Sequence, residues 1–171
     1  HTFCAVDLSA FYFDIRKDTL YCAHPDDTDR KATRVVMAAL YDCLVKWMAP
    51  FICFTTEEAW LSRSPDADSV HLELFPTIPA DWTDDALARK WQTIADVRRV
   101  VTGALEKARA EKKIGASLQA SPRLYAPQSV LDVIAGPEMA DICITSGLAL
   151  VADEVPEGAF TLSDVASVGV V

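Results

Sequence analysis

The sequence of 171 residues predicts a mainly α-helical fold, in which a helical bundle is followed by a small C-terminal α/β appendage. Hydrophobic residues make up 51% of the chain, which is enough to build an ordinary core. Long stretches before residue 114 carry apolar side chains at helical spacing, whereas after residue 120 short strand-like and helix-like segments alternate. We therefore expect two domains, a helical bundle over residues 1–120 and an α/β appendage over residues 121–171.

The first predicted helix covers residues 9–17. Aromatic residues are so dense there that no clean polar face is left, which indicates a mostly buried helix. We expect this helix to begin before His1, and the chain starts without an initiator methionine. At the other end, residues 168–171 resemble a strand that stops at the last residue. Both ends lead us to expect a fragment of a longer, truncated protein.

The second predicted helix covers residues 29–48. Its apolar positions follow one another at steps of four, three, four and four residues: Val36, Leu40, Cys43, Trp47 and Phe51. Asp27 or Thr28 is expected to cap the helix by accepting hydrogen bonds from free N–H groups, and Pro50 is expected to end or bend it. Three basic residues project roughly opposite the apolar stripe: Arg30, Lys31 and Arg34.

A short third helix is predicted to begin at Thr55, because Glu58 follows three residues later and the pair fits a capping box. Glu57 and Glu58 also admit an interpretation as catalytic carboxylates. Adjacent helix residues point about 100° apart, however, so capping and ion pairing are the favoured interpretation. Residues 62–83 are expected to form a surface connection with one short extended piece over residues 70–75.

The last long helix is predicted over residues 83–113. Arg98 lies on its apolar stripe, where an unpaired charge would be very costly, so we expect a structural salt bridge there rather than a ligand contact. Gly115 is expected to end this helix in a left-handed conformation. In the appendage we predict, besides the strand at residues 168–171, two further strands and a helix, with turns at the dipeptides Gly136-Pro137 and Ser146-Gly147. The strands cover residues 123–126 and 142–146, and the helix covers residues 129–135.

The distribution of charge matters more than its total. A net charge of −9 argues by itself against a nucleic-acid partner. Residues 89–113, however, hold 8 of the 16 lysine and arginine side chains and only 3 acidic ones. A local basic stripe of this kind can bind phosphates whatever the total charge. By composition alone, a solvated helix face is the simpler interpretation.

The residues show no catalytic or metal-binding pattern. The five cysteines are scattered without a CxxC motif, which fits neither a disulfide framework nor a zinc site. We expect Cys43 and Cys53 to be small buried hydrophobic residues. No glycine-rich phosphate loop or GxSxG motif occurs, and the three histidines have no metal-ligand or triad-like neighbours. The sequence also has neither a membrane span nor a signal peptide, so we expect a cytoplasmic protein.

Four ordered blocks within residues 3–120 follow a family pattern. The first, at 9–21, is SAFYFDIRKDTLY, and the second, at 47–60, is WMAPFICFTTEEAW. The third is SVHL at 69–72, and the last runs from LEKAR to KIGASLQA within residues 105–120. Together these blocks resemble the isoleucyl-tRNA synthetases, and the KxIGxSLxA pattern favours that family over its leucyl and valyl relatives. Gln119 and Ala116 depart from the family pattern at positions where packing or capping is expected.

The resemblance implies the helical anticodon-binding domain of a class Ia tRNA synthetase, followed by the linker before the family's C-terminal zinc module. Such a fragment would dock the anticodon stem-loop of isoleucine tRNA, and the full-length enzyme would join isoleucine to that tRNA with ATP. The HIGH-like and KMSKS-like segments, the editing domain and the zinc ligands have no counterpart in this sequence. We therefore expect no catalytic residue, metal or cofactor in the fragment, with ATP and Mg²⁺ in the full-length enzyme and Zn²⁺ in the missing module.

Isoleucine tRNA is the expected partner of a monomeric chain, with no DNA and no membrane. Phosphate contacts would come from the basic residues of the two long helices: Arg30, Lys31, Arg34, Arg99, Lys107, Arg109, Lys112 and Lys113. Two other hypotheses stay open from the residues themselves. One is a helical protein–protein interaction module without nucleic-acid binding, whose acidic face docks a basic partner. The other is a small free-standing enzyme, against which the lack of an assembled site argues.

Overall fold

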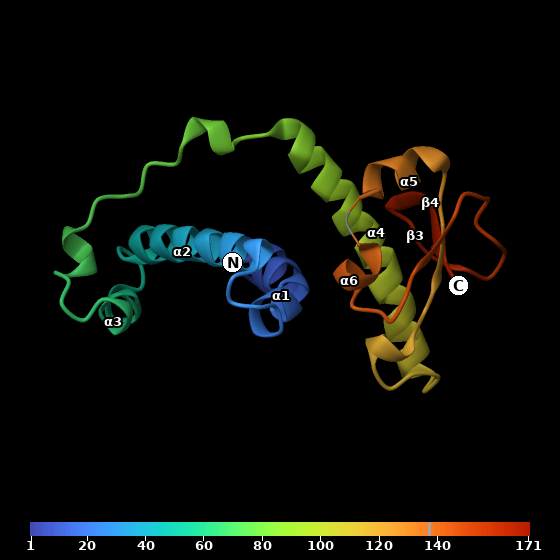
Figure 1. Cartoon of the computed structure of the whole chain (residues 1–171), viewed down its shortest axis with the longest axis horizontal. Coiled ribbons are helices and arrows are strands. Elements are labelled where there is room, and N and C mark those ends of the chain that lie inside the picture. The colour runs from blue at the N-terminus through green and yellow to red at the C-terminus, as the bar shows by residue number, and fades with distance from the viewer. Residues whose placement is uncertain (137) are drawn as a thin grey trace. The chain divides into compact units, whose positions relative to one another are not determined.

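The computed structural model describes residues 1–136 and 138–171, so part of the predicted Gly136-Pro137 turn lies outside the described residues. The fold is mainly helical with a small C-terminal sheet, which confirms the predicted fold class (Figure 1). The chain forms two compact units. Residues 16–83 make the helical unit, and residues 1–15 together with 84–171 make the α/β unit. This spatial grouping runs across residue 120, and the division predicted there stays a prediction.

The helical unit is built from helices α1 to α3 and two 3-10 turns. These are α1 (Lys17–Tyr21), α2 (Thr28–Met48), α3 (Cys53–Arg63), η2 (Val70–Leu72) and η3 (Ala80–Trp82). The Asp27 carboxylate caps α2 by accepting a 2.9 Å hydrogen bond from the backbone N–H of Arg30. The predicted second helix and its cap are therefore confirmed, because a local carboxylate satisfies a free N–H of the first turn.

The buried face of α2 differs from the predicted stripe. Cys43 is buried, but Val36, Trp47 and Phe51 are exposed. The core of the helical unit is formed instead by Val45 of α2, Ala49 one turn later just past the end of that helix, and Val70 of η2. The prediction of one continuous apolar stripe was wrong, because contact with the η2 segment buries a different face of the helix.

Glu57 fastens that η2 segment to α3. Its carboxylate accepts hydrogen bonds of 2.9 Å from the Ser69 hydroxyl and from the backbone N–H of Val70. The glutamate is thus an anchor for a loop, and neither catalysis nor an ion pair is needed to explain it. The η2 turn also replaces the start of the extended piece predicted over residues 70–75.

Helix α3 begins earlier than the sequence predicts. Its first residue is Cys53, and the preceding Ile52 supplies no side-chain cap. The capping box at Thr55 is therefore wrong, because that residue already lies inside the helix. The neighbouring Thr56 hydroxyl instead donates a 3.0 Å hydrogen bond back to the carbonyl of Ile52. Cys53 is exposed, which also corrects its predicted burial.

The α/β unit is organised around α4 (Asp85–Ala110), the longest helix of the chain described. The Asp84 carboxylate caps it with 2.9 Å hydrogen bonds from the backbone N–H groups of Ala86 and Leu87. The helix ends at Ala110, and the left-handed residue that follows it is Lys112, with a φ of 59°, and not Gly115 as predicted. The Gly115 N–H instead donates a 2.7 Å hydrogen bond to the Gln119 side chain, which agrees with the capping role expected there.

The N-terminal segment forms η1 (Phe3–Phe13), a π-helix, and Leu8 is its one buried residue. The prediction of a mostly buried helix over residues 9–17 was therefore wrong in both burial and extent. The density of aromatic residues did not indicate burial, because such rings can contact α4 and still be partly exposed. The Phe11 ring, for example, packs edge-on against Trp91, with 6.2 Å between the ring centroids.

Four short strands form the sheet of the α/β unit, in the order β2-β1-β4-β3. They are β1 (Arg123–Tyr125), β2 (Ala149–Val151), β3 (Phe160–Leu162) and β4 (Val165–Val170). Strand β1 pairs with β2 in parallel and with β4 antiparallel, and β3 pairs with β4 antiparallel. The sheet lies against α4 through β3 and β4 (Figure 1). Strands β1 and β4 and helix α5 (Gln128–Ile134) confirm three predicted elements.

The strand predicted over residues 142–146 is wrong. Residues there belong to α6 (Met139–Cys143), and Ile144 follows with a left-handed φ of 57° that ends the helix. The β-branched residues Ile142 and Ile144 favoured a strand locally, but burial of Met139, Ile142 and Cys143 against α4 decides the outcome.

The salt bridge predicted for Arg98 is confirmed. Its guanidinium lies 2.7 Å from the Asp14 carboxylate, with 13% of the arginine side chain exposed. It also donates hydrogen bonds to the carbonyls of Ile142, at 2.8 Å, and Ala10, at 3.1 Å. Arg98 therefore joins η1 and α6 to α4 through three structural contacts.

Candidate nucleic-acid interface

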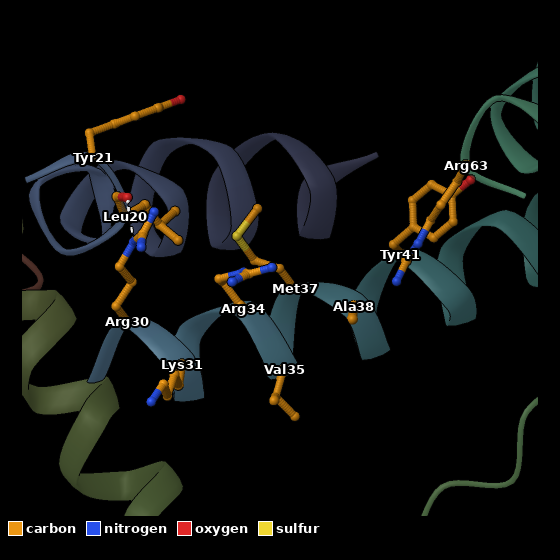
Figure 2. A pocket seen from close by; sticks show the side chains of 10 residues that line it. All are labelled: Leu20, Tyr21, Arg30, Lys31, Arg34, Val35, Met37, Ala38, Tyr41 and Arg63. Carbon is orange, nitrogen blue, oxygen red and sulfur yellow. Dashed lines mark hydrogen bonds between the residues drawn. The ribbon is translucent and has the colours of Figure 1, made fainter. Parts of the chain in front are cut away.

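An open hollow of about 840 Å³ lies on the helical unit, beside α2 (Figure 2). Helix α1 contributes Leu20 and Tyr21 to its lining. Four basic side chains line it as well: Arg30, Lys31, Arg34 and Arg63. Three of these four are residues that the sequence predicts as phosphate contacts. We call this hollow, with its four basic side chains, the basic hollow.

Two of the cations are held in place by neighbours. The Arg30 Nε donates a 3.0 Å hydrogen bond to the carbonyl of Leu20, which fixes the guanidinium between α2 and α1. The Lys31 ammonium lies 3.1 Å from the Asp26 carboxylate, and both side chains are exposed. An exposed pair of this kind contributes little to stability and can exchange its carboxylate for another anion.

Arg34 differs from Arg30 and Lys31 in the interactions of its guanidinium. It is exposed, and among residues 1–136 and 138–171 its guanidinium has no hydrogen bond or ion pair. Figure 2 shows Arg34 and Arg30 reaching to the same side of α2, whereas Lys31 and Val35 point to the other side. A free guanidinium beside a fixed one can grip a phosphate with several N–H donors at once.

Arg63 and Tyr21 were missed by the sequence analysis. Arg63 lies in the last turn of α3, and its guanidinium carbon sits over the Tyr41 ring, 4.7 Å from the centroid. Tyr21 lies at the end of α1 and is almost fully exposed. The aromatic and basic composition of the two short helices was the available signal, but their approach to α2 depends on tertiary structure.

The other predicted residues lie in the α/β unit, at the C-terminal half of α4 and just beyond it. Arg99 forms two ion pairs, at 3.1 Å to Asp96 and at 2.7 Å to Asp164. The hydrogen bond to Asp164, aided by that to Asp96, raises the pKa of Arg99. The same contact lowers the pKa of the Asp164 carboxyl. Arg99 must therefore leave a carboxylate before it can bind a phosphate.

The remaining cations of this group differ in whether they form ion pairs or hydrogen bonds. Arg109 pairs with Glu106 and donates a 3.0 Å hydrogen bond to the Ser117 hydroxyl. Lys113 lies 2.6 Å from Glu111, and this hydrogen bond lowers the pKa of the glutamate. Lys107 and Lys112 have no ion pair among the residues described by the structure. Exposed lysines with weak or no partners are suited to positioning a phosphate backbone.

The described residues hold neither a metal-binding cluster nor an activated thiol. Within residues 1–136 and 138–171, no group of three or more His, Cys, Asp or Glu side chains is placed to hold a metal ion. Burial raises the pKa of the Cys143 thiol to about 12 and, more weakly, that of Cys43, so neither is an activated nucleophile. No helix over the described part of the chain has the length and apolar content to cross a membrane.

Comparison with known proteins gives matches along the whole chain. The family model described as the anticodon-binding domain of tRNA ligase matches residues 1–124. Isoleucine–tRNA ligase of Agrobacterium fabrum is 57% identical over 167 residues, or 97% of this chain. Those of Mesorhizobium japonicum and Brucella abortus are 58% and 52% identical, each over 170 residues and 99% of this chain. The chain spans 17% to 18% of the length of these relatives.

Proposed function

This chain belongs to the family of anticodon-binding domains of tRNA ligases, and from this membership we propose that it docks the anticodon stem-loop of isoleucine tRNA. The isoleucine specificity comes from the names of relatives that are 52% to 58% identical to it. On this proposal the chain is one part of an isoleucine–tRNA ligase. Docking would hold the tRNA while the chemistry takes place in other parts of that enzyme.

The observation that carries the proposal is the basic hollow inside the matched region. The helical unit that holds it has 7 basic and 11 acidic residues, yet four of the 7 line this one hollow. Phosphates are attracted to such a local concentration of Lys and Arg even when the net charge is negative. Arg34 supports the proposal most directly, because its guanidinium has no competing carboxylate among the described residues.

The whole enzyme is proposed to be cytoplasmic and to join isoleucine to tRNA at the expense of ATP. ATP and Mg²⁺ would then be bound outside this chain, and Zn²⁺ in a separate C-terminal module. The donor set described here does not fit a metal, so we derive no step through these groups from this chain. We expect the chain by itself to form no isoleucyl-adenylate.

The test is binding of the chain to isoleucine tRNA over a salt series, alongside a tRNA with an altered anticodon. Each phosphate contact is expected to contribute roughly 0.7–0.9 to the slope of log K against log salt concentration. The variant K31Q/R34Q should bind more weakly and with a shallower slope. The matched control is R89Q/R123Q, which removes the same charge from exposed arginines outside the predicted set.

Three outcomes separate the hypotheses. A steep slope that only K31Q/R34Q reduces would support docking through the basic hollow, and weaker binding of the altered tRNA would add recognition of the anticodon. If both variants weakened binding equally, the total charge of the chain and not the basic hollow would be responsible. Binding that is undetectable or independent of salt would contradict the proposal and leave a protein–protein interaction module as the better hypothesis.

A further inference from the structure

A second, smaller hollow adjoins the basic hollow and shares a wall with it. It has a volume of about 240 Å³ and is lined by Asp42, Trp60 and Ser64. Three further residues line both hollows: Ala38, Tyr41 and Arg63. The wall between a strongly basic space and a small polar and aromatic one is therefore the Tyr41–Arg63 pair.

We propose that this pair is a stacking platform for one unpaired nucleotide of RNA, with the base edge in the smaller hollow and the flanking phosphates on the cations of the basic hollow. The inference rests on the proposed function and states which structural feature of the tRNA this site would take. Arginine guanidinium planes and aromatic rings are the surfaces on which proteins stack bases splayed out of loops.

The platform is held in position from both sides. The Tyr41 hydroxyl donates a 2.6 Å hydrogen bond to the carbonyl of Ala59, which fixes the ring against α3. The Arg63 guanidinium carbon lies 4.7 Å from the centroid of that ring, as Figure 2 shows from close by. One face of the guanidinium is thus occupied by Tyr41. Arg63 is exposed, and its other face is the surface that the proposal assigns to the base.

The basic hollow supplies what the backbone on either side of such a base requires. Arg30, Lys31 and Arg34 follow one another along α2 and line the same space as Arg63. Stacking without nearby cations would favour any flat apolar molecule, and cations without a stacking surface would favour any polyanion. Their combination around one hollow favours single-stranded nucleic acid, in which a charged backbone and a flat base occur together.

The smaller hollow adds a preference among bases. The Asp42 Oδ1 lies 3.2 Å from the Lys46 ammonium, which orients the carboxylate. Lys46 in turn lies 3.0 Å from Glu73 and 5.2 Å from the centroid of the Trp60 ring. A carboxylate accepts hydrogen bonds and repels carbonyl oxygens, so Asp42 should favour bases with an exocyclic amino group. Cytosine is then preferred over uracil, which carries a carbonyl oxygen at the same ring position.

The first experiment uses isoleucine tRNA carrying 2-aminopurine at one unpaired position of the anticodon loop at a time. With the full chain, one position should show a change in fluorescence on binding that reports stacking. Arg63→Lys keeps the positive charge but not the planar group, so it should lose that change while keeping the salt slope. Arg63→Ala should bind roughly 5- to 150-fold more weakly, because stacking of a base contributes that factor. Arg123→Lys is the matched control and should change nothing.

The second experiment compares hexacytidine with hexauridine, whose bases have similar size. The chain should prefer hexacytidine by about fivefold or more. Asp42→Asn should remove this preference, because its amide can donate to a carbonyl as well as accept. Circular dichroism of each variant checks that the helices are kept.

The two proposals fail in different ways. Steep, salt-dependent binding of tRNA that Arg63→Lys leaves unchanged in both affinity and fluorescence would overturn the stacking platform and leave the docking proposal standing. Equal binding of hexacytidine and hexauridine would overturn the role of Asp42. No binding of tRNA by the unaltered chain would overturn both.

Discussion

Arg98 shows that the structural role of a charged side chain can be predicted from its place on an apolar stripe. Its place on the apolar stripe of α4 demanded a partner, and the fold supplies the Asp14 carboxylate at 2.7 Å and two carbonyls. The centroid of the Phe11 ring also lies 5.6 Å from the guanidinium carbon of Arg98. Because one side chain binds groups on η1 and α6 together, its removal breaks several hydrogen bonds at once.

Arg98→Met is expected to lower the free energy of unfolding by about 2–4 kcal/mol. The methionine fills much of the space, but the partly buried Asp14 carboxylate and the Ile142 carbonyl lose their donor. Denaturant unfolding monitored by circular dichroism measures the change. Arg89→Met, on the exposed face of the same helix, should change stability by less than about 0.5 kcal/mol. Equal losses in the two variants would contradict a structural role for Arg98.

The cysteines provide a second test at the residue scale. Burial raises the pKa of Cys143 to about 12, so the folded chain keeps this thiol protonated where the unfolded chain ionises. The folded state therefore binds more protons above the unfolded pKa of about 8.5, and its stability declines as the pH rises from there towards 12. At pH 8 iodoacetamide should modify the exposed Cys4, Cys22 and Cys53 and spare Cys43 and Cys143, as peptide mass mapping would show. Fast modification of Cys143 in the native chain would contradict its burial.

At the scale of elements, local capping chemistry defines the two long helices. Asp27 and Asp84 each accept hydrogen bonds from free N–H groups of the following first turn. Both helices were predicted from the spacing of their apolar residues, and the cap at Asp27 was predicted as well, whereas the cap at Asp84 is seen only in the structure. Strands β2 and β3 were not predicted from the sequence. Strand β2 is formed by pairing with β1, which lies far earlier in the chain, and β3 by pairing with the adjacent β4.

Asp84→Ala should lower stability by about 1 kcal/mol, because two N–H groups at the start of α4 lose their acceptor. Thermal or denaturant unfolding measures the change, and amide hydrogen exchange should quicken in the first turn alone. Asp66→Ala, in the connection after α3, removes the same charge without a cap and should be close to neutral. If Asp66→Ala cost as much as Asp84→Ala, charge rather than capping would be responsible.

The candidate site was predictable only in part, because some of its residues are brought together by packing between helices. Arg30, Lys31 and Arg34 lie within two turns of one helix, so their shared surface follows from helical geometry. Arg63 lies 29 positions further along the chain from Arg34, and its approach to Tyr41 depends on how α3 packs on α2. The sequence also cannot indicate that Arg99 is held by Asp164, because that carboxylate belongs to the turn between β3 and β4.

For the molecule as a whole, a net charge of −9 opposes any polyanion at long range, so binding depends on where the cations are free. The basic residues of α4 illustrate this point. They are numerous, but Arg99 and Arg109 are each paired with a carboxylate, as is Lys113 just beyond the helix. The basic hollow of the helical unit has fewer cations and fewer competing carboxylates, which favours it as the stronger phosphate site.

Asp164→Asn distinguishes local release of a cation from a change in total charge. Without the carboxylate, Arg99 keeps only its 3.1 Å pair with Asp96 and becomes available to a phosphate. Affinity for isoleucine tRNA at low salt should rise, and the slope of log K against log salt should steepen by roughly 0.7–0.9, the contribution of one contact. Glu157→Gln changes the net charge equally on the same unit but releases no arginine, so its slope should stay that of the unaltered chain. If both variants steepen the slope alike, the field of the whole molecule governs binding. If neither does, Arg99 lies outside the surface that meets the tRNA.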